Sequence, residues 1–215
     1  MAYIQYQRGE LTMLKDFLVG LVVANGFEWV LHKYVLHGTH RTGKPRYSPV
    51  PDSMKSHWEH HREVRKTTFL DHGYVEGISN WRTKNEIVSL AVVATVAGGL
   101  FYPVSKGMAA AVVYSACNYY YIHRRAHLEP EWAMKKIPWH YDHHMNSNQD
   151  ANWCVTKPWF DYILGTRVIS SEDLQEQNPL GIALPQSVSK ILNSVASSYF
   201  PAKWVSKVPQ LETHM

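Results

Sequence analysis

The amino-acid sequence predicts an all-α protein in which membrane helices carry a polar helical cap. Residues 11–36 are largely apolar and long enough to cross a bilayer core. Residues 87–104 and 107–122 contain no charged residue, and only Ser105 and Lys106 lie between them. We therefore predict one apolar helix followed by a helical hairpin, each arm of which is near the lower length limit for a spanning helix.

The two polar parts of the chain, residues 37–86 and 123–180, would then emerge on the same side of the membrane. Both are rich in Lys and Arg, and such an excess beside apolar segments marks the cytoplasmic side. We predict a single membrane domain over residues 1–180 with a cytoplasmic cap. In the tail, residues 181–215, apolar residues at helical spacing predict an amphipathic helix over residues 187–200, bounded by Pro185 and Pro201.

Charge and cysteine content exclude several classes of protein. The chain has 22 Lys and Arg against 18 Asp and Glu, a balance too even for nucleic-acid binding, which calls for a clustered basic face. Its two cysteines, Cys117 and Cys154, match no zinc or redox spacing.

Histidines are the most informative residues, since ten of the thirteen fall into four groups. The groups are His32 and His37; His57, His60 and His61; His123 and His127; and His140, His143 and His144. His40, His72 and His214 remain outside them.

Helix geometry gives these spacings a meaning. Positions i, i+3 and i+4 share one helix face, so each His-x-x-His-His group projects three imidazoles in one direction. His123 and His127, at i and i+4, also share a face. His32 and His37, at i and i+5, are roughly 140° apart on a regular helix. They require a local distortion, a helix end, or ligation of two different metals.

Ten imidazoles suit a dinuclear centre of late first-row transition metals, because calcium and magnesium prefer oxygen ligands. A structural zinc site uses four ligands, often including cysteine. A two-haem cytochrome is the inorganic alternative, but it would need histidines inside long spanning helices. Glu59 and Asp142 precede the two His pairs and either accept imidazole N–H groups or are solvated helix acids.

The four spacings HX4H, HX2HH, HX3H and HX2HH resemble the fatty acid hydroxylase / sterol desaturase superfamily of membrane-bound non-haem di-iron oxygenases, most closely the fatty acid 2-hydroxylase-like members. Residues 152–166, NWCVTKPWFDYILGT, are similar to the closing motif of that family. Asn152, Asp161, Gly165 and Thr166 match it, whereas Leu164 stands in place of Phe. Cys154 stands where a small residue is expected. The resemblance covers roughly residues 20–167.

The resemblance implies ten metal ligands, namely the histidines of the four groups, and no catalytic residue beyond the metal centre. It further implies two iron ions (with zinc possible as purified), O2, and oxidation of a C–H bond in a lipid or fatty acyl substrate. Electrons would come from a separate protein of ferredoxin or cytochrome type. Asn152 and Asp161, together with Glu59 and Asp142, are expected behind the ligands.

Several alternatives stay open at this point. Within the same superfamily the chain could be a desaturase, a carotenoid or sterol hydroxylase, or an ether-lipid monooxygenase. Outside it, the alternatives are a non-catalytic metal-binding membrane protein and a membrane zinc hydrolase. An apolar substrate would approach between the first helix and the hairpin, and the candidates to line that route are Phe27, Trp29, Tyr34, Trp58 and Tyr119.

Overall fold

The computed structural model describes residues 2–38, 52–174, 176–200 and 203–204, and it is mostly helical, as predicted. The helices are α1 (Ala2–Val30), which continues as a π-helix η1 (Leu31–Leu36), α2 (Asp52–Lys66), α3 (Gly73–Glu76), the 3-10 turn η2 (Gly77–Ser79), α4 (Trp81–Phe101), α5 (Lys106–Leu128), α6 (Pro130–Lys136), α7 (Pro138–Met145), α8 (Trp159–Ile163), the 3-10 turn η3 (Glu172–Leu174) and α9 (Gln186–Tyr199). The strands are β1 (Val168–Ile169) and β2 (Lys203–Trp204).

The chain forms two compact units. Unit 1 comprises Met1–Glu59 and Gly73–Arg124, and unit 2 comprises His60–His72 and Arg125–Met215. The division falls inside α2 and near the end of α5, so two of the histidine groups are divided between the units. The single domain expected over residues 1–180 stays a prediction.

In unit 1, α4 carries the clearest membrane signature. The helix begins at Asn80, whose side-chain oxygen accepts the backbone N–H of Arg82 and caps the first turn. Among the residues that the structure describes, α4 is the one helix long and apolar enough to cross a membrane, and only 6% of its apolar window is buried. Outward-facing apolar residues follow one another at every fourth position, Val88, Val92, Val96 and Leu100. A core helix of a soluble protein would bury such a stripe.

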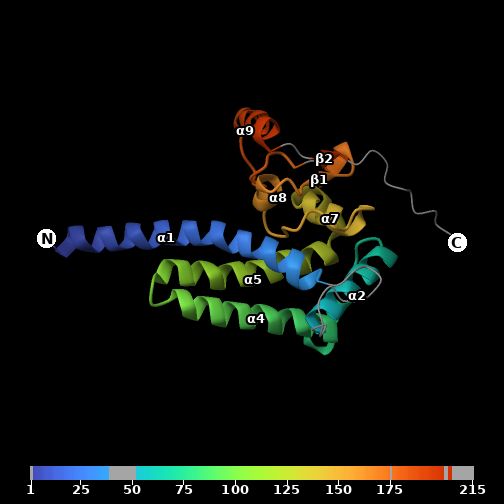
Figure 1. Cartoon of the computed structure of the whole chain (residues 1–215), viewed down its shortest axis with the longest axis horizontal. Helices are drawn as coiled ribbons and strands as arrows, with labels where there is room; N and C mark the ends of the chain where they lie inside the picture. Colours follow the sequence, from blue (N-terminus) through green and yellow to red (C-terminus); the bar gives the residue numbers. More distant parts are fainter. Residues whose placement is uncertain (1, 39–51, 175, 201–202, 205–215) are drawn as a thin grey trace. The chain divides into compact units, whose positions relative to one another are not determined.

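The helices α1, α4 and α5 of unit 1 lie side by side (Figure 1). Two glycines let α1 and α5 approach closely. A Cβ atom at Gly20 would lie 2.6 Å from Cβ of Ala111, and one at Gly107 would collide with the backbone of Met13. Ser105, in the turn before α5, donates a hydrogen bond of 2.6 Å to Asp16 of α1. The first half of α1 is therefore held tightly against the start of α5.

Unit 2 is built around α7. Trp139 of α7 is fully buried and donates to the backbone oxygen of Val155 at 2.9 Å. Strands β1 and β2 pair in parallel, with Val168 opposite Lys203. The helix expected over residues 187–200 is confirmed as α9, which begins and ends within one residue of that range.

Candidate metal centre

The irregular spacing of His32 and His37 is accommodated by the π-helix η1. The backbone N–H of His37 bonds to the carbonyl oxygen of His32 at 3.0 Å, an i to i+5 bond that defines this wider turn. The wider turn brings the two rings together, with centroids 5.2 Å apart. Of the alternatives that this spacing left open, the structure shows the local distortion, as a π-helix.

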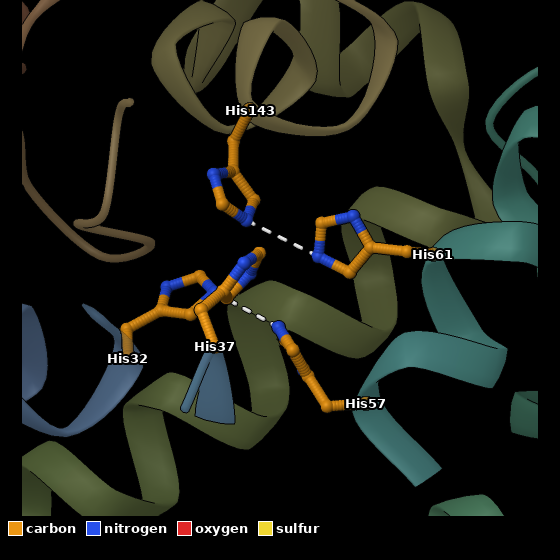
Figure 2. Close-up of side chains that lie close together, drawn as sticks. All are labelled: His32, His37, His57, His61 and His143. Carbon is orange, nitrogen blue, oxygen red and sulfur yellow. Dashed lines mark hydrogen bonds between the residues drawn. The ribbon is translucent and has the colours of Figure 1, made fainter. Parts of the chain in front are cut away.

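Three histidines of unit 1 converge. The Nε2 atoms of His32 and His57 are 3.1 Å apart, and the rings of His37 and His57 have centroids 4.9 Å apart. All three rings are buried, and each offers a nitrogen within 4.8 Å of those of the other two. Figure 2 shows the pair His32–His57 joined by a dashed line. Such a group of buried imidazoles is suited to a metal ion.

Unit 2 gathers six further histidines, which come from α2, α5 and α7 and are all buried. They are His60, His61, His127, His140, His143 and His144. Ring nitrogens of His60, His127 and His144 lie within 4.8 Å of one another. Figure 2 shows the Nε2 atoms of His61 and His143, which are 3.2 Å apart. Histidines from three of the four groups therefore lie close together within unit 2.

In three rings of unit 2, the Nδ1 atom donates a hydrogen bond to a carboxylate or a backbone carbonyl oxygen. His60 Nδ1 donates to the Asp71 carboxylate at 2.7 Å, His127 Nδ1 to the carbonyl oxygen of Phe69 at 3.0 Å, and His143 Nδ1 to that of Ala151 at 2.7 Å. A neutral ring that donates from Nδ1 carries its lone pair on Nε2, which is the tautomer that binds a metal through Nε2. The donor set therefore fits transition-metal ions.

His123 of unit 1 has the same arrangement. Its Nδ1 atom donates to Glu86 of α4 at 2.6 Å, and the hydroxyl of Tyr74 donates to the other oxygen of Glu86 at 2.6 Å. A carboxylate that receives the second nitrogen of a ligand histidine fixes the orientation and tautomer of the ring.

Asp71 and Glu86 were not identified from the sequence, in which Glu59 and Asp142 were the candidate imidazole acceptors, with solvated helix acids as the alternative. Glu59 is half-buried on α2, and its role stays a prediction. The only available signal for Glu86 was its place as the last charged residue before an apolar run, because a polar group beside such a run often serves the site.

The carboxylate of Asp142 accepts hydrogen bonds from Arg167 and Ser170. Arg167 is fully buried and bridges two acids, donating to Asp142 and to Glu176 at 2.8 Å each. Burial alone would lower the pKa of the Arg167 guanidinium, but Glu176 and Asp142 together raise it above its ordinary value. This charged network holds the side of α7 that bears Asp142. Arg167 follows the closing motif directly and was also missed.

Asn152 and Asp161 stabilise the backbone beside His143. Asp161 accepts the backbone N–H groups of Trp153 and Cys154, both at 2.8 Å, and burial raises the pKa of its carboxyl. Asn152 adopts a positive φ of 58°, which asparagine tolerates better than most residues. These contacts fix the segment that follows α7, including the Ala151 carbonyl that receives His143. Their expected place behind the ligands stays a prediction.

Burial and its histidine neighbours keep His144 neutral. Burial, reinforced by the neighbouring His61, His140, His127 and His60, lowers the pKa of His144 well below its ordinary value. A neutral imidazole keeps the lone pair that a metal ion needs. His144 is therefore in its ligand form at neutral pH.

A cavity of about 230 Å³ lies within unit 1, between α1 with η1, α4 and α5. Its walls are almost entirely apolar, and His32 lies at one end. Of the residues expected to line a substrate route, Phe27 and Tyr119 line this cavity, whereas Trp29, Tyr34 and Trp58 are not among its lining residues.

The fold and these histidines define a helical protein with buried histidine clusters that could hold metal ions and with an apolar helix of membrane-spanning length. The fatty acid hydroxylase family matches residues 17–166, and the chain belongs to this family. The resemblance expected from the histidine spacings is thus confirmed, and membership implies an oxidoreductase of hydroxylase or desaturase type. Family and apolar helix together indicate a membrane protein. No curated protein and no solved structure shows a significant match to the chain.

Proposed function

We propose that the protein is an O2-dependent di-iron hydroxylase that acts on a C–H bond of a lipid or fatty acyl substrate. The observation that carries the proposal is the orientation of the buried imidazoles, whose Nδ1 atoms donate to carboxylates and carbonyls, so that Nε2 is the nitrogen each ring would offer to a metal ion. Membership of the fatty acid hydroxylase family supports the same reaction class.

The proposed ligands are the ten histidines of the four groups. Four of them belong to unit 1 (His32, His37, His57 and His123), and six belong to unit 2 (His60, His61, His127, His140, His143 and His144). When bound, the two iron ions would supply the activation of O2 and the oxidation of an otherwise unreactive alkyl carbon. A separate electron-transfer protein of ferredoxin or cytochrome type would provide the electrons.

The residues around the ligands orient them. Asp71 holds the ring of His60, and Glu86 holds that of His123, so each presents Nε2 in a fixed direction. Arg167 anchors α7 through Asp142. Rigid support of this kind keeps ligand positions within the narrow tolerance that metal chemistry requires.

The cavity of unit 1 is the proposed place for the alkyl part of the substrate. Its apolar walls favour a hydrocarbon chain, since each methylene buried there is stabilised by about 0.8 kcal/mol. His32 at one end would bring a carbon of the chain close to a metal ion. We further propose that α1 and the consecutive helices α4 and α5 enter the bilayer. The Lys and Arg residues of the polar segments would then keep the metal site on the cytoplasmic side.

The test is turnover and metal content of the full-length protein in lipid nanodiscs, with a reductant system, candidate lipids and isotopically labelled O2. We expect label in a hydroxylated product. His60→Ala and His143→Ala should abolish turnover and lower the metal content. His72→Ala, an exposed histidine outside the four groups, should change neither.

Other outcomes separate the alternatives. An unsaturated product would identify a desaturase, and bound metal without O2-dependent turnover would identify a non-catalytic metal protein. Activity that survives without O2 in protein holding only zinc would identify a hydrolase. Zinc content alone does not decide the matter, because imidazole sites bind zinc more tightly than ferrous iron.

A further inference from the structure

The apolar cavity of unit 1 has two different ends. One end, called the metal end because His32 is a proposed ligand, includes His32, Ser89 and Tyr119. The far end includes Val23, Phe101 and Val112. This assignment follows from the course of the helices, because α4 runs opposite to α1 and α5 (Figure 1).

At the far end of the cavity, α1 and α5 are in direct contact. Just beyond Val23, Gly20 of α1 meets Ala111 of α5 so closely that an added Cβ would lie 2.6 Å from the alanine side chain. No alkyl chain passes between two helices at that separation, because packing there is already at van der Waals contact. A chain that enters at the metal end therefore has no exit between α1 and α5 there, and Phe101 of α4 lines the same end of the cavity.

We propose that Ala97 and Phe101 are specificity-determining residues that set the length of the alkyl chain held by the cavity. This inference rests on the proposed function, since it assumes that the substrate chain lies here. Both residues belong to α4 and line the cavity, with Phe101 at the far end and Ala97 one helical turn nearer the metal end. The small side chain of Ala97 leaves the path open, whereas the ring of Phe101 ends it.

The helix rise converts these positions into a chain length. At about 1.5 Å per residue, roughly 18 Å separate Ser89 from Phe101, and roughly 12 Å separate Ser89 from Ala97. Tetrahedral C–C bonds of about 1.5 Å advance an extended alkyl chain by roughly 1.25 Å per carbon. The open path therefore holds about 14 carbons, and a block at position 97 would leave about 10.

The experiment measures binding and turnover separately on the full-length protein. Saturated fatty alcohols of about 8 to 18 carbons, a range that spans the expected length, compete with a fluorescent fatty alcohol in detergent micelles. The same protein then oxidises a mixture of acyl lipids of these lengths in nanodiscs. The variants are Ala97→Phe, Phe101→Ala and a matched control, Val96→Phe, whose side chain is exposed on the outer face of α4.

We expect the longest well-bound chain to shorten by about four carbons in Ala97→Phe, to lengthen in Phe101→Ala, and to stay unchanged in Val96→Phe. The inference would be overturned if the longest well-bound chain is the same in Ala97→Phe as in Val96→Phe and is also unchanged in Phe101→Ala. Phe101→Ala removes volume, so it serves as the decisive variant if Ala97→Phe does not fold.

The two readouts separate the inference from the proposed function. Suppose that the wild-type protein forms no oxidised product, but the longest well-bound chain differs between the variants. That result would refute the hydroxylase and leave the length determinants standing. O2-dependent turnover with the same product lengths in all variants would refute the length determinants and leave the hydroxylase standing.

Discussion

Replacing Arg167 with Met should destabilise unit 2 strongly. The substitution keeps much of the side-chain volume but removes the charge that bridges Asp142 and Glu176, whose side chains are 0% and 4% exposed. Removing one partner of a buried ion pair leaves uncompensated charge and costs about 3 to 5 kcal/mol. For a chain of this size each kcal/mol lowers the melting temperature by roughly 2–4 °C, so we expect a loss of about 10 °C.

Arg125→Met is the matched control. Arg125 pairs with Glu129 across one helical turn, but these side chains are 35% and 51% exposed. An exposed pair of this kind contributes up to about 1 kcal/mol, and the contact of Arg125 with the ring of Trp132 adds a comparable amount. The control should therefore lose at most a few degrees.

The assay is thermal unfolding followed by tryptophan fluorescence, with iron content measured on the same samples. The triple variant Arg167→Met, Asp142→Asn, Glu176→Gln removes all three charges together and should recover much of the loss, because no buried charge is left unpaired. The reasoning is refuted if Arg167→Met unfolds within a few degrees of Arg125→Met, or if the triple variant is less stable than the single one.

Three further predictions concern the metal ligands and their support. Asp71→Asn should weaken metal binding by about 10- to 100-fold, because the amide no longer accepts a strong hydrogen bond from His60. Chelator competition measures the metal affinity, and the control Glu129→Gln, at an exposed residue, should leave it unchanged. If the two variants bind metal equally well, Asp71 does not support His60 as a ligand. The lowered pKa of His144 means that the folded, metal-free protein keeps this ring neutral, while the unfolded chain takes up a proton below the ordinary value of 6.5. Stability in urea should therefore be full above that pH and fall below it, by at most about 1.4 kcal/mol per pH unit for this residue, and His144→Phe should flatten the dependence. Asp161→Ala leaves two backbone N–H groups without their acceptor and should lower the free energy of unfolding by about 2 to 4 kcal/mol; a loss below about 0.5 kcal/mol in chemical denaturation would show that the carboxylate is dispensable.

Local sequence spacing predicted the features that depend on helix periodicity. The groupings at i, i+3 and i+4 identified buried histidines. The misfit of His32 with His37 left open a local distortion, a helix end or two different metals, and the structure shows the distortion as a π-helix. The closing motif likewise identified Asn152 and Asp161, since their partners lie nearby in the chain.

Long-range contacts were beyond such reasoning. Asp71 meets His60 across a loop, Glu86 meets His123 from a different helix, and Arg167 reaches back to Asp142. No periodicity in the sequence connects these pairs, because folding and not spacing brings them together. The cavity was predicted only as a route between helices, and its far end depends on the close approach at Gly20, which composition does not reveal.

The π-helix Leu31–Leu36 has a consequence for how the protein tolerates change. Because its hydrogen bond spans five residues, deleting one residue between His32 and His37 would convert this turn into an ordinary α-turn, in which residues four apart share one face. One inserted residue, in contrast, would place the two histidines six apart and turn the second ring away from the first by about 100° more. A single-residue insertion in this stretch should therefore lower the metal content of the protein more than a single-residue deletion does.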